Sequence, residues 1–475
     1  MRPIFNFLPL ITALCVGCPL LVSVAHAQTD CEKKATKFDT RLYQLYIGKS
    51  GDLVDPASGT EVKDIDIVDS CDQEVSKDKE DAYISRIFKN FDEKKDKNPH
   101  LQLTIYVHGG LNKMKEAISH ANERVVKAML DDNKYPLFIS WNSGAFSNYS
   151  DHLFLLRRGT LSWSHGPSSS PFVLVEDLAR AVARLPASTY QVLFTLNSKR
   201  QDDSVHGEEA SEAEKRLAEL IGDGQFKMRG TEHPDNSGLN FRDRWTLFNP
   251  LKLVTAPFLD GLGTGAWNSM LRRTDMVLHK EAPANSPEEQ KETETAASRF
   301  LTRWQDKDLN KHARSEVILI GHSMGAIITN NILTKYQNIN FSQIVYMAAA
   351  CTVKDLEYVI APYLERNEEA VFYNLTLNPE RDIYENTFYD FLPRGSLLMW
   401  IDQTLANVNS FQDRTAGYWF NIVRSAKRTF GEGVRERVHL TKFGINDDGS
   451  PQNHGEFDNY PFWKKSFWEG NLKGE

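Results

Sequence analysis

One segment of the chain, positions 321–325, has the G-x-S-x-G pattern of a nucleophilic serine. The apolar segment 317–320 directly before it is typical of a buried strand, and the apolar residues from Ala326 onward begin a helix. Glycines on either side of Ser323 let strand and helix approach each other, and such a strained turn lifts the serine hydroxyl above the edge of a sheet. The turn also places the Met324 N–H beside that hydroxyl, at the positive end of the helix. The pattern therefore predicts that Ser323 attacks an acyl carbonyl.

This Gly-His-Ser-Met-Gly segment resembles the nucleophile elbow of the α/β-hydrolase fold, and the resemblance covers residues 101–141 and 286–460. The resemblance implies an α/β architecture with a doubly wound, mostly parallel sheet. It also implies a catalytic triad whose members follow the order serine, aspartate or glutamate, histidine along the chain. The histidine would accept the proton of Ser323, and an acyl-enzyme would form and then be hydrolysed.

Two histidines, His439 and His454, follow the strand that is expected over 371–377. His439 lies in the alternating segment 437–443, which is typical of a strand, so its side chain would point into a packed layer or into solvent. His454 lies in the loop beyond that strand. Because a general base must reach the serine from a loop at the carboxyl edge of the sheet, we expect His454 to be the base.

The acid of the triad is expected directly after the strand 371–377. Asp382 is the first candidate and Glu380 the second, although either carboxylate could be a solvated loop charge or a partner of Arg381. Two further candidates are Asp355 and Asp390. The acid would orient the imidazole and stabilise its charged form.

An oxyanion hole needs two backbone N–H donors, and Met324 supplies one of them. The second is expected from the loop after the strand 101–107, which contains Gly109, Gly110 and Leu111. This loop resembles the His-Gly-Gly-Gly loop of esterases and lipases, with Leu111 in place of the last glycine. We expect Gly110 to donate, with Leu111 as the alternative. No metal or cofactor is expected, because H-E-x-x-H is missing and 454–458 lacks a second histidine at ligand spacing.

Strand and helix patterns alternate around these residues, which predicts an α/β sheet covered on both faces. Strands are expected over 101–107, 136–141, 317–320, 344–347, 371–377 and 437–443, and short edge strands within 28–75. Helices are expected over 82–91, 114–129, 325–336 and 356–364. A further helix is expected to begin at Ser286, with Pro287 and Glu289 completing its N-terminal signal.

The chain divides into four predicted parts. These are a signal peptide (1–27), an N-terminal extension (28–95), a catalytic domain (96–144 and 286–475) and an inserted cap (145–285). The cap segment 247–271 is rich in apolar residues and glycine, which favours acyl chains as ligands. Arg272 and Arg273 follow it and are expected at the surface, where they could contact an anionic lipid surface.

The first 27 residues have the pattern of an export signal. Arg2 precedes an apolar stretch at 11–24, and Ala25-His26-Ala27 is a cleavage site of the A-x-A type. A membrane anchor and a lipoprotein modified at Cys18 are the alternatives. The pattern predicts a periplasmic or secreted protein.

Three cysteines remain after cleavage at residue 27. Cys31 and Cys71 lie in the N-terminal extension, and in an oxidising compartment they could close a loop of about 40 residues as a disulfide. Cys351 follows an apolar strand, so we expect it to be a buried free thiol.

The net charge of the chain limits the classes of partner that it can bind. Its 475 residues carry 56 Lys+Arg and 64 Asp+Glu, a formal net charge of −8, which argues against nucleic acid. The expected function is an exported serine hydrolase acting on small-molecule or lipid carboxylic esters. Amides, thioesters and acyl transfer to another acceptor need the same triad, and a binding module on the same fold is the non-catalytic alternative.

Overall fold

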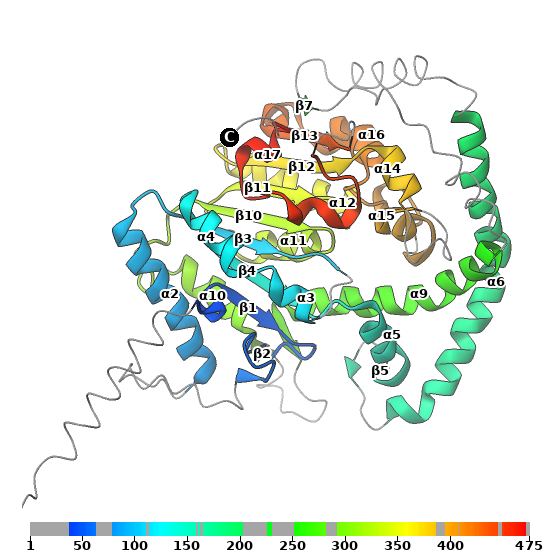
Figure 1. The fold of residues 1–475 in the computed structure, drawn as a ribbon, viewed down its shortest axis with the longest axis horizontal. Coiled ribbons are helices and arrows are strands. Elements are labelled where there is room, and N and C mark those ends of the chain that lie inside the picture. The colour runs from blue at the N-terminus through cyan, green and yellow to red at the C-terminus, as the bar shows by residue number, and fades with distance from the viewer. Residues whose placement is uncertain are drawn as a thin grey trace, which may run out of the picture.

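A nine-stranded sheet forms the centre of the molecule (Figure 1). The computed structural model describes residues 38–62, 78–110, 114–157, 160–161, 165–202, 226–229, 251–281, 292–385, 395–406, 408–444 and 449–471. The predicted signal peptide, Cys31, Cys71 and Asp390 lie outside these residues.

The sheet is parallel except at one edge, as the sequence predicts for its α/β part. In spatial order its strands are β2 (Leu53–Val54), β1 (Gln44–Ile47), β4 (Lys134–Trp141), β3 (Gln102–Val107), β10 (Val317–His322), β11 (Phe341–Met347), β12 (Val371–Leu377), β13 (Val438–Phe443) and β7 (Lys227–Arg229). Only β2 runs antiparallel, to β1. The six strands expected from 101 to 443 are thus confirmed, each to within three residues at either end.

Both ends of the sheet come from segments outside the predicted catalytic domain. Strand β1 of the N-terminal extension pairs with β4, and β7 of the predicted cap segment pairs with β13. The expected edge strands are therefore found, and they extend the central sheet.

Helices cover the two faces of the sheet. They include α2 (Lys79–Lys97), α3 (Met114–Ser119), α4 (Glu123–Asp131), α10 (Ala296–Gln305), α11 (Gly325–Lys335), α12 (Val353–Asp355), α13 (Ala361–Arg366), α16 (Trp419–Thr429) and α17 (Lys465–Trp468). Neighbouring side chains along a strand alternate between faces. On one face, Tyr346 of β11 donates to Asn330 of α11. On the other face, Tyr373 of β12 packs its ring on Trp468 of α17.

One helix begins later than the sequence predicts. Ser286, Pro287 and Glu289 lie outside the described residues, but 292–294 form strand β9 (Glu292–Glu294) and not the first turns of a helix. The helix that follows, α10, is capped by Thr295, whose hydroxyl accepts from the Ser298 N–H. This helix prediction is wrong in its start, because Thr295 supplies the cap that was assigned to Ser286.

A group of three helices stands beside the sheet: α5 (Ala145–Phe154), α6 (His165–Asp202) and α9 (Leu251–Met276) (Figure 1). The expectation that Arg273 is a surface charge is wrong. Its side chain is buried between α9 and α5, where it donates to the Asn142 carbonyl (2.7 Å) and pairs with Asp151. The basic pair beside the cap segment therefore offers no exposed site at Arg273 for anionic lipid.

The chain changes direction across the sheet between β3 and β10. From β3 it passes through α3 and α4 to β4, whereas β10 lies on the other side of β3 and leads through α11 to β11. In open parallel sheets such a switch point opens a crevice at the carboxyl ends of the two strands. Gly109 and Gly110 follow β3, and Ser323 follows β10, so the predicted oxyanion loop and nucleophile meet there.

Candidate active site

Ser323 occupies a strained turn between β10 and α11. Its φ of 51° lies in the left-handed region, which a residue with a side chain adopts at a cost of about 1–3 kcal/mol. The flanking glycines are required by space: a Cβ on Gly325 would lie 2.2 Å from the Val107 carbonyl oxygen, and one on Gly321 would lie 2.9 Å from the backbone of Ala326. Strand and helix approach closely at this turn because both neighbours of Ser323 in the pattern lack a side chain.

The structure brings Ser323 and His454 together. The Nε2 atom of His454 lies 2.8 Å from Ser323 Oγ, and both side chains are buried. His454 begins the short helix η9 (His454–Asn459), which Asn453 and Glu456 cap reciprocally.

The alternative histidine lies elsewhere. His439 is the second residue of β13, near its amino end, and its ring packs on Tyr373 with centroids 4.4 Å apart. Ser323 lies beyond the carboxyl end of β10, so His439 is not at the serine.

Two side chains hold the backbone of His454, and the sequence indicated neither contact. His322 Nε2 lies 3.0 Å from the His454 carbonyl oxygen, and Glu385 Oε2 accepts the His454 N–H at 3.0 Å. Since a carbonyl accepts only, His322 Nε2 carries the proton. His322, which directly precedes Ser323, thus holds His454, whose ring contacts Ser323.

A third contact fixes the far end of η9. Asp458 lies 3.3 Å from His120 Nδ1 and 3.4 Å from the Tyr106 hydroxyl. The helix that carries His454 is therefore attached to the β3 side of the crevice as well as to the Ser323 turn.

His454 is neutral in this environment. Burial, and to a smaller extent the neighbouring His322, lower its pKa to about 3. An unprotonated Nε2 facing Ser323 Oγ can accept the hydroxyl proton, and the proton of the neutral ring then lies on Nδ1. Among the described residues no atom hydrogen-bonds to His454 Nδ1.

Asp382 is buried, and its carboxyl group lies near Ser396 without a well-formed hydrogen bond to any described residue. The residue lies in α14 (Pro379–Tyr384), it is 1% exposed, and no described atom hydrogen-bonds to either oxygen. Burial raises its pKa to about 8, with Glu385 and Asp402 adding to the rise and Ser396 opposing it. The structure therefore does not join the predicted acid to His454 by a hydrogen bond, although Glu385 neighbours both.

Among the other acid candidates, Asp355 is engaged elsewhere. Asp355 caps α12, where its Oδ2 accepts the Thr352 N–H at 2.7 Å. The side chain of Glu380 lies outside the described residues. Glu385 reaches the backbone of His454 with one oxygen, and burial raises its pKa.

The two residues predicted to supply the oxyanion donors are in close contact. A Cβ on Gly110 would lie 2.6 Å from Met324 Sδ, and one on Gly109 would lie 3.0 Å from Ser323 Cβ. Met324 stands at the N-cap position of α11, and no side chain caps this helix. The N–H groups of Ala326 and Ile327 donate to the carbonyls of Ser323 and Met324, so only N–H groups earlier in the turn can serve another acceptor. Leu111 lies outside the described residues.

His108 orients the glycine loop. Its Nδ1 donates to the Gly109 carbonyl (2.6 Å), which also accepts from the Ser143 hydroxyl (3.3 Å), while its Nε2 accepts the Trp141 N–H (3.0 Å). Burial lowers the pKa of His108 to about 3, consistent with a neutral ring. Because C=O and N–H of a trans peptide point in opposite directions, fixing the Gly109 carbonyl also fixes the direction of the Gly110 N–H.

The arrangement can support covalent acyl chemistry. It combines a hydroxyl at a strained turn, a neutral imidazole within hydrogen-bond reach, and a glycine loop packed against the Ser323–Met324 turn. The described residues contain no group of three His, Cys, Asp or Glu side chains that could hold a metal ion. Cys351 is a buried free thiol, as expected, and burial raises its pKa well above the ordinary value.

Comparison of the chain with protein-family models, with curated proteins and with solved structures gives no match.

Proposed function

We propose that the chain is a serine hydrolase of the α/β-hydrolase fold that cleaves carboxylic esters. The contact that carries the proposal is the 2.8 Å approach of His454 Nε2 to Ser323 Oγ at a turn with φ of 51°. A solvated serine needs neither a strained backbone nor a buried imidazole. The predicted signal peptide extends the proposal to a periplasmic or secreted enzyme.

The proposed reaction begins with attack of Ser323 Oγ on the ester carbonyl carbon. His454 Nε2 accepts the hydroxyl proton, and the N–H groups of Met324 and Gly110 bind the developing oxyanion. Collapse of this intermediate breaks the bond to the alcohol oxygen, which takes the proton from His454. Water then attacks the acyl-enzyme carbonyl carbon and gives a proton to His454. Collapse of this second intermediate breaks the bond to Ser323 Oγ, which takes that proton from His454, and the acid is released.

Asp382 is the proposed acid of the triad. Protonation of His454 places a cation in a buried site, where a carboxylate stabilises it. Within the described part of the chain, no atom hydrogen-bonds to the oxygens of Asp382 or to Nδ1 of His454. Glu385 contacts the backbone of His454 and raises the pKa of Asp382. A pair formed between them would satisfy both groups.

A fluorophosphonate probe tests the nucleophile directly, because it bonds to an activated serine through loss of fluoride. We expect the wild-type protein to be labelled at Ser323, and the Ser323→Ala variant to stay unlabelled. Ser168→Ala, at an exposed serine of α6, is the matched control and should be labelled like the wild type. An unlabelled wild-type protein would favour a binding module over an enzyme.

Nitrophenyl esters of increasing acyl length then test the substrate class. We expect turnover that depends on Ser323 and reports the depth of the acyl pocket. Turnover of the matching amides or thioesters alone, or acyl transfer to an added alcohol in preference to water, would replace the ester proposal while keeping the nucleophile.

A further inference from the structure

Ser396 is a buried serine whose hydroxyl forms no hydrogen bond with any described residue. It is 1% exposed and stands at the N-cap position of α15 (Leu397–Trp400). A serine at this position ordinarily accepts a hydrogen bond from one of the first N–H groups of its helix, but the side chain of Ser396 does not. Because a buried hydroxyl without a hydrogen bond costs free energy, its direction in the fold needs a reason other than capping.

The backbone holds Ser396 beside Asp382. The Ser396 N–H donates to the Asp382 carbonyl oxygen at 2.6 Å, and the Gly395 N–H donates to the Glu385 carbonyl oxygen at 3.0 Å. Both side-chain oxygens of Asp382 are buried and, like the Ser396 hydroxyl, have no hydrogen bond to a described residue. The two groups are therefore neighbours, and each has the capacity that the other lacks a partner for.

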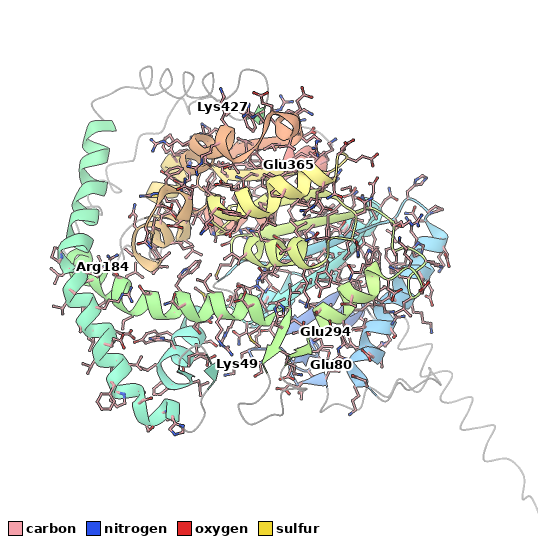
Figure 2. All side chains as sticks on the ribbon, turned by 180° about the vertical axis from the view of Figure 1, so that it is seen from behind. Lys49, Glu80, Arg184, Glu294, Glu365 and Lys427 are labelled. Atoms are coloured by element: carbon pink, nitrogen blue, oxygen red, sulfur yellow. The ribbon has the colours of Figure 1, made fainter. Side chains whose placement is uncertain are left out.

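The segment that carries Ser396 is also held at its other end. Helix α15 continues into η6 (Ile401–Leu405), and both views place it at the end of the sheet nearest α6 and α9 (Figure 1 and Figure 2). The Thr264 hydroxyl of α9 lies 3.5 Å from the Thr404 carbonyl oxygen, and a Cβ on Gly263 would lie 2.5 Å from the Leu405 side chain. Contacts on both sides of α15 thus restrict the movement of Ser396.

The ionisable groups around Asp382 disfavour its charged form. Glu385 and Asp402 raise its pKa in the same direction as burial. Tyr418 is a buried phenol near the same carboxyl group, since Asp382 contributes to the raised pKa of Tyr418. Arg381, the residue before Asp382, donates to a backbone carbonyl directly beyond β13.

A hydroxyl suits a carboxyl group in either protonation state. It accepts from the protonated form and donates to the ionised form, and the bond to the charged form is the stronger of the two. The Ser396 hydroxyl is the described neighbour that lowers the pKa of Asp382, against the rise that burial causes.

We propose that Ser396 is a positioning residue of the hydrolase site, whose hydroxyl donates to the ionised carboxyl group of Asp382 and holds it for His454. Only the ionised form stabilises protonated His454, so this donor increases the fraction of the protein that can react. The role in the reaction rests on the proposed function, whereas the contact between Ser396 and Asp382 does not.

Urea unfolding against pH tests the contact without any assumption about catalysis. Loss of the donor should raise the pKa of Asp382 in the folded chain, while the unfolded chain is unaffected. The folded state of Ser396→Ala then retains the proton to higher pH, so its stability should keep falling to a pH about one unit higher than in the wild type. In an Asp382→Asn background, Ser396→Ala should change stability equally at every pH.

Ser425 provides the matched control. It is a buried serine of α16 whose hydroxyl donates to the Asn421 carbonyl at 2.8 Å. Ser425→Ala should change stability equally at every pH in the presence of Asp382. Ser396→Cys nearly keeps the side-chain volume with a weaker donor, so it gives the same test if Ser396→Ala does not fold.

The pH profile of kcat tests the role in the reaction. Ser396→Ala should move the acidic limb of the profile upward by about one pH unit, with kcat about tenfold lower below that limb and KM little changed. Ser425→Ala should keep the wild-type profile.

Two outcomes would overturn the proposal. Equal pH dependence of unfolding in wild type, Ser396→Ala and Ser396→Cys would remove the contact with Asp382. A shifted unfolding curve with an unchanged kcat profile would remove the role in the reaction. If the wild type hydrolyses no ester and takes up no fluorophosphonate, the proposed function fails, and the unfolding curves still decide whether Ser396 binds Asp382.

Discussion

His454 and Asp382 are buried on the same side of the crevice, but their surroundings differ. The backbone of His454 is held at both its N–H and its carbonyl oxygen, and its Nε2 meets Ser323 Oγ. The carboxylate of Asp382 is equally buried and has no hydrogen bond from a described residue. One group is fixed by its neighbours, whereas the other is desolvated by them.

This difference separates two ways of preparing a site. Holding a base by its backbone limits the positions that its ring can reach before substrate arrives, which lowers the entropy that the reaction must lose. Leaving a carboxyl group desolvated favours its protonated form until a cation appears beside it. The comparison predicts that changes at His454 act on proton transfer, whereas changes at Asp382 act on charge and therefore on pH dependence.

Replacing the base should have the largest effect. We expect His454→Ala to lower kcat by about 10⁴- to 10⁶-fold, because loss of the general base leaves Ser323 unactivated. Steady-state hydrolysis of a nitrophenyl ester measures this. His439→Ala, checked for folding by thermal melting, should retain turnover close to the wild type. The opposite result for the two histidines would assign the base to His439.

Replacing Asp382 tests the other half of the comparison. Asp382→Asn keeps the shape and should lower kcat by about 10⁴-fold if Asp382 stabilises protonated His454. Asp402→Asn is the control, since Asp402 accepts from the Thr415 N–H and the Asn421 side chain, and its effect on kcat should be far smaller. Equal activity of Asp382→Asn and wild type would remove Asp382 from the triad.

The same substitution should change stability with pH. The pKa of Asp382 is about 8 in the folded chain, against 3.8 as its ordinary value, so the folded state retains a proton that the unfolded state loses. That difference destabilises the folded protein progressively as pH rises from about 4 to about 8. Urea midpoints of Asp382→Asn should therefore exceed those of the wild type by an increment that grows across this range and is constant above it. An increment that is the same at pH 4 and pH 8 would contradict a buried, unpaired carboxyl group.

Releasing the backbone of His454 should have a smaller effect. Glu385→Ala leaves the His454 N–H without its acceptor, at a cost of about 1–3 kcal/mol, and we expect kcat to fall by about 10- to 100-fold with little change in KM. Glu385→Gln keeps an acceptor oxygen and should restore most of the activity. If Gln and Ala reduce kcat equally, the charge of Glu385 matters and not its hydrogen bond.

The sequence predicts the nucleophile turn well because the turn is local. Close contacts at this strand–helix connection require glycine at 321 and 325, so the residues that form the pattern are also the ones that make the turn possible. The contacts of His322 and Glu385 with His454 could not be predicted, since they join residues 132 and 69 positions apart. Their geometry depends on how β12, β13 and the loops beyond them pack.

The sheet follows the same rule. Strands buried on both faces, such as β10 and β12, are apolar and can be predicted, whereas β7 has three residues and an exposed, polar pattern.

The sequence alone misplaces the start of α10, because Ser286 and Thr295 are both acceptable caps and only tertiary packing selects Thr295. Six apolar side chains between 172 and 185 of α6 are exposed, although their periodicity would also fit a core helix, so their direction required the structure.

Two glycines provide the finest test of the difference between fixed and open surroundings. Gly455 follows His454, and a Cβ there would meet nothing within 4 Å, whereas one on Gly325 would lie 2.2 Å from the Val107 carbonyl oxygen. Gly455→Ala should stabilise the protein by about 0.4–1 kcal/mol, through the unfolded chain, and leave kcat unchanged. Gly325→Ala should destabilise it by about 3 kcal/mol and disrupt the Ser323 turn. Urea unfolding measures both. If Gly455→Ala destabilises the protein, the space around residue 455 is smaller than the structure indicates.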